Sequence, residues 1–192
     1  MDDAHPCPWH GPTVLLLPGW QNSGPGHWQT RWEALHGFVR VQQDDWHWPR
    51  RGDWMAQLEE AVLARPGPWV LAAHSLGCHL VAAWAAHSAH SARVQAALLV
   101  APPDTTRADL PPQLANWRRP VLQPLPFAAA VVASRDDPFA DWAASQALAQ
   151  AWGVPCHDAG PAGHLNADSG LGDWPGGLAL LQALCRQASS SP

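Results

Sequence analysis

Short apolar runs alternate along this chain with longer segments in which apolar residues recur three and four positions apart. Short continuous apolar runs predict buried strands, and the spacing of three and four predicts amphipathic helices. The predicted strands cover residues 13–17, 38–42, 69–73, 94–100, 127–133 and 154–158. The predicted helices cover residues 27–35, 54–65, 76–90, 141–152 and 178–188.

Strands that alternate with helices predict an α/β fold, in which a mainly parallel sheet of about six strands carries helices on both faces. Residues 102–126 break the alternation, because they contain seven prolines and room for only a short helix near 113–117. That stretch is too short and too broken for a separate domain. We therefore expect a single domain over residues 1–192, with flexible ends at 1–11 and 189–192.

Composition narrows the functional classes. Of the 192 residues, 47% are hydrophobic and 14% charged, as expected for a globular domain with a sizeable core. The net charge of -5 and the 11 basic residues argue against a nucleic-acid-binding surface. Every basic residue is an arginine. The absence of lysine excludes a phosphate-loop lysine and a Schiff-base lysine, and with them ordinary pyridoxal chemistry.

The expected location is the cytoplasm. No apolar run reaches the roughly 18 residues that a membrane span needs, and the first residues lack the basic start and apolar core of a signal peptide. The cysteines are scattered, with no Cys-x-x-Cys pair that would indicate a redox or zinc motif. We expect free, mostly buried thiols at Cys7, Cys78, Cys156 and Cys185.

The segment AHSLG at residues 73–77 joins a predicted strand to a predicted helix and has a serine, Ser75, at its centre. A sharp turn from strand to helix exposes a serine hydroxyl only when small residues flank it, because the turn crowds these positions. Ser75 is therefore the predicted nucleophile. The alternative is that Ser75 is only the N-cap of the following helix.

A serine hydroxyl needs a histidine to take its proton and a carboxylate to orient that histidine. This type of turn predicts the chain order serine, acid, histidine. Asp136 and Asp137 follow the predicted strand 127–133, and His164 follows the last predicted strand. We favour Asp137 as the acid. In the alternative, Asp137 caps a helix whose first residue is Pro138, and Asp136 is the acid.

Two backbone N–H groups are predicted to stabilise the oxyanion that forms when a serine attacks a carbonyl. The first is that of Leu76, at the start of the helix, and the second that of Trp20, because Gly19 lets the backbone turn this amide inward. The same loop lacks the third glycine of G-x-G-x-x-G, and no G-K-[ST] follows. We therefore reject a nucleotide-binding loop.

Other histidines and tryptophans receive structural interpretations. His74 is expected to point away from Ser75 and to pack or form a hydrogen bond. His87 and His90 lie one helical turn apart, but no third metal ligand is evident, so a solvated helix face is favoured. Most of the 13 tryptophans are expected in the core. Trp20, with Trp46 or Trp48, is expected to line an apolar pocket, which the proline-rich segment 102–126 should leave comparatively open.

These motifs resemble the small α/β-hydrolases grouped as the YdeN-like, or retinoblastoma-binding-protein-9-like, serine hydrolases. The matching segments are LPGW (17–20), GHWQTRWE (26–33), AHSLG (73–77), APPD (101–104), SRDDPF (134–139), GHLN (163–166) and SGLGDWP (169–175). The resemblance implies an α/β-hydrolase fold without a large cap, and hydrolysis without a metal or cofactor.

It also places Ser75, Asp137 and His164 at the positions of the family's triad. One departure is Ala73, where glycine is usual, but alanine is small enough for the turn. The simplest expectation for Asn166, Asp168 and Asp173 is that they hold the His164 loop through local hydrogen bonds.

The predicted function is that of a serine hydrolase that cleaves a carboxylic ester or related acyl bond through an acyl-enzyme. Its expected partner is a small-molecule ester or acyl substrate, with no nucleic acid and no membrane span. A binding module with weak activity is the alternative, since the resembled family is associated with a protein partner. The same triad also serves amidases, thioesterases and acyltransferases.

Overall fold

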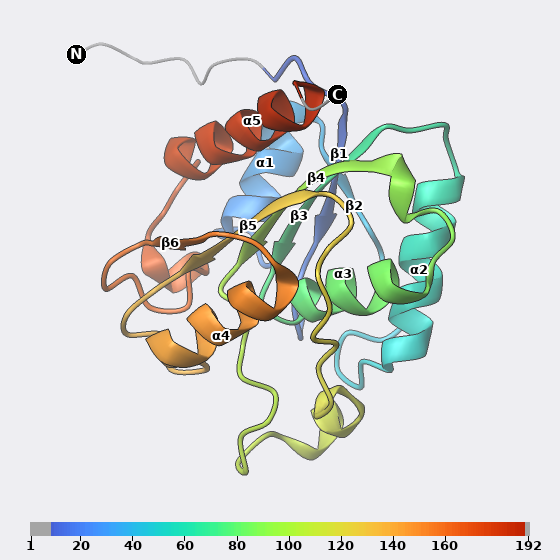
Figure 1. Ribbon diagram of the computed structural model, residues 1–192. Helices are drawn as coiled ribbons and strands as arrows, with labels where there is room; N and C mark the ends of the chain where they lie inside the picture. The colour runs from blue at the N-terminus through green and yellow to red at the C-terminus, as the bar shows by residue number, and fades with distance from the viewer. Residues whose placement is uncertain (1–8, 191–192) are drawn as a thin grey trace, which may run out of the picture.

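A parallel six-stranded sheet forms the centre of the computed structural model, which describes residues 9–190 (Figure 1). The strands are β1 Thr13–Leu17, β2 Val39–Arg40, β3 Trp69–His74, β4 Val94–Val100, β5 Ala128–Ala133 and β6 Cys156–Asp158. They lie in the order β2-β1-β3-β4-β5-β6, and every neighbouring pair is parallel. The predicted α/β fold with a mainly parallel sheet is therefore confirmed.

The strand order reverses between β1 and β3. From β1 the chain moves outward to β2, then returns to the other side of β1 as β3 and continues outward to β6. In open α/β sheets, ligands bind beyond the carboxyl ends of the strands at such a reversal. The loop after β1 and the turn after β3 therefore meet where a site is expected.

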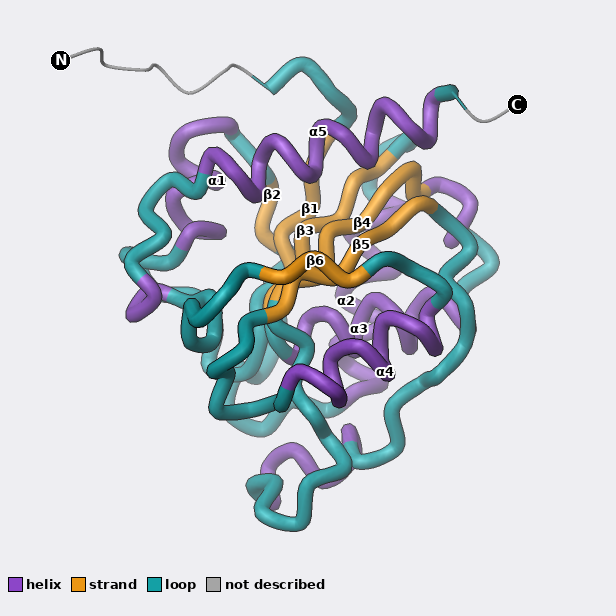
Figure 2. Tube along the Cα trace, turned by 60° about the vertical axis from the view of Figure 1, so that its left-hand side comes forward, coloured by secondary structure: helices purple, strands orange, loops and turns teal. Residues whose placement is uncertain are grey.

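Helices cover both faces of the sheet (Figure 2). Helices α1 Trp28–His36 and α5 Pro175–Ser189 pack on one face. Helices α2 Arg51–Leu63, α3 Leu76–His87 and α4 Trp142–Trp152 pack on the other. The central strand β3 is buried along its whole length, because it is covered on both faces.

The predicted boundaries fail mainly at the ends of elements. The two edge strands are shorter than predicted: β2 keeps two residues and β6 keeps three. Edge strands pair on one side only, so their ends leave the ladder easily. Helix α3 ends at His87 rather than at residue 90, because Ser88 takes an extended backbone and its hydroxyl donates to Glu59.

The proline-rich segment contains a single 3-10 helix, Pro112–Trp117, close to the predicted short helix. Its Trp117 indole is buried and donates to the Pro49 carbonyl 2.8 Å away. Arg118 donates to the carbonyls of Arg107 and Leu110. These bonds tie the segment to itself and to the α2 side of the sheet, without a cap domain.

Tryptophans fill the core as predicted, and each fully buried one also ties two parts of the chain together. The fully buried ones are Trp28, Trp32, Trp54, Trp84, Trp117 and Trp152. Each indole N–H donates to an oxygen outside its own element; the acceptors are Leu165 O, Asp173 O, Asp45 O, Glu59 Oε2, Pro49 O and Val121 O. A buried indole thus satisfies its donor and, with the same contact, fixes a loop or, for Trp84, the neighbouring helix α2.

The chain ends and thiols complete the fold. The ends predicted to be flexible lie largely outside the described residues; within them, Trp9 packs its ring on Phe38 and Ser189 is the last residue of α5. The thiols of Cys78, Cys156 and Cys185 are free, the first and last being buried, while Cys7 lies outside the described residues. Within residues 9–190, no helix is both long and apolar enough to cross a membrane.

Candidate active site

Ser75 lies at the tight turn between β3 and α3, which we call the elbow (residues 74–77). Its backbone has φ 54° and ψ -123°, a strained conformation for a residue with a side chain. The Ser75 N–H donates to Val100 O at 2.8 Å, which ties the turn to the neighbouring strand. Ser75 occupies the N-cap position, but its hydroxyl makes no cap hydrogen bond to α3. Its role as a mere helix cap, the alternative from the sequence, is therefore wrong.

Crowding explains the small residues around the elbow. A Cβ atom on Gly77 would lie 2.2 Å from Leu17 O, and one on Gly19 would lie 2.7 Å from Ser75 Cβ. No side chain fits at either position, so the backbone of the β1 loop can approach Ser75 directly. Ala73, at the position where glycine is usual, is fully buried in the core without such a clash.

His164 contacts both Ser75 and Asp137. Its Nε2 lies 2.9 Å from Ser75 Oγ, and its Nδ1 lies 3.0 Å and 2.9 Å from the two carboxylate oxygens of Asp137. A carboxylate only accepts, so Nδ1 carries the proton and Nε2 is left to accept the Ser75 hydroxyl. The side chains of His164 and Asp137 are only 9% and 2% exposed, which shields the pair from water.

The two aspartates differ in their contacts. Asp136 accepts from Ser134 Oγ at 2.7 Å and from the Gly163 N–H at 2.8 Å, and these bonds, that of Ser134 first, lower the pKa of its carboxyl. It thus supports the His164 loop. The N-cap of α4 is Asp141, which accepts from the Ala144 N–H. The alternative in which Asp137 caps a helix beginning at Pro138 is therefore wrong.

The loop after β1 approaches Ser75 from the other side. Gln21 and Asn22 both have left-handed backbones, with φ 68° and 66°. The Gln21 N–H donates to Trp46 O, and the Asn22 side chain accepts from Arg40, which fixes the loop on both sides. The Trp20 indole donates to His47 O and lines the pocket. The assignment of the Trp20 and Leu76 N–H groups to an oxyanion remains a prediction.

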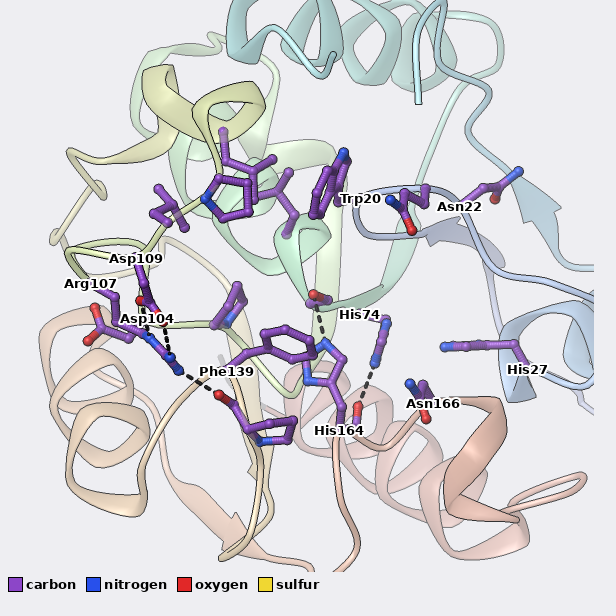
Figure 3. A pocket seen from close by; sticks show the side chains of 18 residues that line it. Trp20, Asn22, His27, His74, Asp104, Arg107, Asp109, Phe139, His164 and Asn166 are labelled. Atoms are coloured by element: carbon purple, nitrogen blue, oxygen red, sulfur yellow. Dashed lines mark hydrogen bonds and ion pairs between the residues drawn. The ribbon is translucent and has the colours of Figure 1, made fainter. Parts of the chain in front are cut away.

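His74 corrects one expectation. Its Nε2 lies 2.8 Å from His164 O, so the expected hydrogen bond is confirmed. The ring does not point away from the site, however. It lines the same pocket as Ser75, with its centroid 4.8 Å from that of His164 (Figure 3). The imidazoles pack together because His74 ends β3 at the edge where the His164 loop returns.

A cavity of about 490 Å³ surrounds Ser75 and His164. Apolar groups line one part of it; they are Trp20, Leu76, Leu110, Pro111 and Leu114. Uncharged polar side chains and histidines line the part at the right of Figure 3; they are Asn22, His27, His74 and Asn166. Charged side chains line the part at the left; they are Asp104, Arg107 and Asp109. Phe139, half exposed, packs its ring 4.6 Å from the ring of His164. The sequence pattern missed Phe139 and His27, although both stand inside matching segments.

The prediction that tryptophans line the pocket is confirmed only for Trp20. Neither Trp46 nor Trp48 lines the cavity. The Trp46 ring packs against that of Trp54, 5.5 Å away, and Trp48 is 58% exposed. The proline-rich segment forms one wall of the pocket, since Leu110, Pro111 and Leu114 line it together with Trp20.

The expected local hydrogen bonds are found at Asn166 and Asp168, but the contacts of Asp173 are long-range. The Asn166 side chain accepts from the Asp168 N–H at 3.0 Å, and Asp168 contributes through this backbone group. Asp173 pairs with Arg31, and its carbonyl accepts from Trp32.

The other histidine pair has no shared ligand. His87 contacts the Ala83 carbonyl of its own helix, and His90 pairs with Glu59. In the part of the chain that the structure describes, no three His, Cys, Asp or Glu side chains group as metal ligands would.

Comparison with known proteins places these features in a family. A family model described as serine hydrolase matches residues 14–183. A YdeN-like hydrolase from Pectobacterium atrosepticum is similar at 28% identity and TM-score 0.81, with 92% of this chain and 91% of that chain covered. The search of curated proteins found no match.

Two more distant structures share the fold. The ydeN gene product from B. subtilis is 21% identical, with TM-score 0.70 and coverage of 91% and 98%. The esterase RhEst1 from Rhodococcus sp. is 13% identical, with TM-score 0.60 and coverage of 94% and 91%. Since the family model spans most of the chain and the YdeN-like structure matches it nearly end to end, this chain belongs to the serine hydrolase family, among its YdeN-like members.

Proposed function

We propose that this protein hydrolyses a carboxylic ester or a closely related acyl bond, with Ser75 as nucleophile, His164 as general base and acid, and Asp137 as the carboxylate that orients His164. The observation that carries the proposal is the unbroken hydrogen-bonded chain from Ser75 Oγ through both nitrogens of His164 to Asp137. This chain opens into the cavity, where a substrate carbonyl can reach Ser75.

In the first half-reaction, Ser75 Oγ attacks the substrate carbonyl carbon while His164 Nε2 takes the hydroxyl proton. The carbonyl oxygen becomes an oxyanion, for which the N–H groups of Leu76 and Trp20 are the proposed donors. Asp137 stabilises the imidazolium that forms on His164. His164 then gives its proton to the leaving alkoxide, the alcohol departs, and the acyl group remains on Ser75.

Water completes the cycle. His164 takes a proton from a water molecule, whose oxygen attacks the acyl carbon. The second tetrahedral intermediate collapses when His164 returns the proton to Ser75 Oγ. The acid leaves and the serine is regenerated, so no metal or redox step is required.

The cavity favours an uncharged substrate with an apolar part. Trp20, Leu110 and Leu114 supply the apolar wall, and burial of each methylene there contributes about 0.8 kcal/mol. Among the described residues that line the cavity, the guanidinium of Arg107 is already engaged by Asp109 and by the Pro138 carbonyl. A substrate carboxylate would therefore have to displace an existing ion pair.

A fluorophosphonate probe tests the nucleophile. Wild-type protein should be labelled, and Ser75→Ala should not. Asp136→Asn is the matched control, because it removes the neighbouring carboxylate but keeps an oxygen that can accept from the Gly163 N–H; it should still be labelled. Absence of labelling in the wild type would favour the binding-module alternative.

Comparison of turnover among substrate classes identifies the type of acyl bond that the protein cleaves. p-Nitrophenyl esters of increasing acyl length, aminoacyl amides and acyl thioesters should be compared at equal concentration. We expect ester hydrolysis, with kcat/KM rising over the first few added methylenes as they fill the apolar wall. A profile confined to amides, to thioesters or to transfer onto an added acceptor would assign the corresponding alternative chemistry. We also propose a cytoplasmic location, supported by the three free thiols among the described residues.

A further inference from the structure

Three histidines from distant parts of the chain pack in a row beside Ser75. His27 precedes α1, His74 ends β3 and His164 follows β6. The ring centroids are 4.5 Å apart for His27 and His74 and 4.8 Å apart for His74 and His164, both edge to face. His27 is 4% exposed and His74 is 5% exposed, and neither has a role in the proposed reaction.

The contacts define the tautomer of each ring. A carbonyl oxygen only accepts, so His74 Nε2 must carry the hydrogen that it donates to His164 O at 2.8 Å. His27 Nδ1 accepts from the Gln29 N–H at 3.1 Å, which leaves the hydrogen of a neutral ring on Nε2. Among the described residues this buried Nε2 has no hydrogen-bond partner. In Figure 3 the nitrogen-bearing end of His27 points toward His74.

The rings of His27 and His74 are both neutral near pH 7. Burial, with a smaller contribution from Arg40, lowers the pKa of His27 to about 3. Burial also holds the pKa of His74 well below its ordinary value. A cation on either ring would oppose the imidazolium that the mechanism places on His164. The row therefore supplies packing and one hydrogen bond without supplying charge.

The hydrogen bond acts on the peptide group of His164 itself. The neighbouring Gly163 and Leu165 both have left-handed backbones, with φ 57° and 49°. Their peptide groups are fixed by other bonds, to Asp136 from the Gly163 N–H and from Trp28 to the Leu165 carbonyl. His74 fixes the carbonyl between them, and the orientation of that peptide sets where Nε2 points.

We propose that His74, supported by the ring of His27, is a positioning residue that holds the His164 imidazole in line with Ser75 and Asp137. This inference rests on the proposed function for its catalytic consequence. A buried imidazole in a core position costs free energy that an apolar side chain would not, and the bond to His164 O compensates for part of it. A purely space-filling role would need no donor at this atom.

The test replaces His74 with two side chains that separate donor from bulk. His74→Phe keeps a ring and removes the donor. His74→Gln keeps an N–H group at a similar reach. We expect kcat for ester hydrolysis to fall about tenfold to a hundredfold in His74→Phe, the range that misplacement by about 1 Å produces. KM should change little, and His74→Gln should recover most of the loss.

A proton NMR signal gives a second readout that does not depend on turnover. The His164 Nδ1–H is buried and donates to Asp137, so it should give a far-downfield resonance in wild type and in His74→Gln. It should be lost or broadened in His74→Phe. His79 is the matched control for this signal, because it is 3% exposed and bonds to the Pro103 carbonyl at 2.7 Å, away from His164. His79→Phe should leave the His164 resonance in place.

The outcomes separate the inference from the function. Equal loss in His74→Phe and His74→Gln, or a retained resonance in His74→Phe, would overturn the positioning role. A wild type that shows the resonance but cleaves no ester would overturn the proposed function, while the dependence of the resonance on His74 would still support the positioning.

Discussion

The elbow and the His164 loop position the two groups proposed to react, the Ser75 hydroxyl and the His164 imidazole, in different ways. At the elbow, backbone crowding does so, because Gly77 and Gly19 leave no room for a Cβ atom beside Leu17 O and Ser75. In the His164 loop, side chains from elsewhere in the chain do so, through His74, Asp136 and Trp28. A local steric rule therefore places the hydroxyl, and a set of long-range hydrogen bonds places the imidazole.

Replacement of the two adjacent aspartates, one at a time, should show the largest difference in kcat. Asp137→Asn keeps the size of the side chain but cannot favour the Nδ1–H tautomer of His164. Loss of that partner in a triad lowers kcat by about 10⁴. Asp136→Asn should lower kcat less than about tenfold, because the Gly163 N–H can still find an amide oxygen. Steady-state kinetics on one p-nitrophenyl ester compares the two, and equal losses would show that Asp137 has no special role.

Adding a methyl group at the elbow should lower the stability of the folded protein rather than only its catalytic rate. A Cβ in Gly77→Ala would meet Leu17 O at 2.2 Å, so two backbone segments would have to separate. We expect a loss of about 3–5 kcal/mol in the free energy of unfolding. Gly52→Ala in α2 is the control, since nothing lies within 4 Å of its Cβ position. Urea denaturation should show Gly52→Ala as stable as wild type or more so, and a stable Gly77→Ala would refute the crowding.

Acid should destabilise the folded protein through the buried, neutral histidines of the row. Burial lowers the pKa of His27 from its ordinary value of 6.5 to about 3 in the folded protein. The contribution of neutral His27 to the free energy of unfolding is therefore fully present above pH 6.5 and is lost as the pH falls from 6.5 toward 3. Between pH 7 and pH 5 the unfolded chain binds a proton at His27 and the folded chain does not, which costs about 2 kcal/mol.

His27→Asn isolates that contribution, because asparagine can still cap α1. Its free energy of unfolding should vary less with pH than that of the wild type, by about 2 kcal/mol between pH 7 and pH 5. Urea titrations at both pH values measure the difference. Identical pH dependence in the two proteins would mean that His27 binds its proton as readily in the folded chain as in the unfolded chain.

The smallest effect is expected at the wall of the pocket. Arg107 is partly exposed; it pairs with Asp109 and donates to the Pro138 carbonyl, next to Asp137. Exposed ion pairs contribute little, so Arg107→Gln should change kcat/KM less than about threefold. Any change should lie in KM for long acyl chains, because the proline-rich wall and not His164 is affected. A large fall in kcat would instead make this contact part of His164 alignment.

The elbow could be predicted from the sequence more completely than the contacts that hold the His164 loop. Ser75, Asp137 and His164, which the structure brings into contact, could be proposed as a triad because the chemistry requires these residue types in this order after strands. The small residues at the elbow followed from local crowding. Short edge strands and the early end of α3 were mispredicted, since pairing on one side and the Ser88 contact depend on neighbours that only the fold brings together.

His74 shows why the remainder could not be predicted. Alternation along a strand gives the side to which a residue points, but not what returns to that side 90 residues later. The same holds for Phe139 over His164 and for Trp46, which packs on Trp54 instead of lining the pocket. Tertiary contacts made by loops determine these roles, and local patterns contain no signal for them.

Trapping of the acyl-enzyme directly tests the proposal that Ser75 is the nucleophile. Wild-type protein is mixed with p-nitrophenyl acetate, quenched in acid within the first turnover and digested for mass spectrometry. The proposed mechanism predicts a burst of p-nitrophenol and an acetyl group on the peptide that contains Ser75, absent in Ser75→Ala. Turnover without a modified Ser75, or acetylation at another side chain that persists in Ser75→Ala, would contradict it.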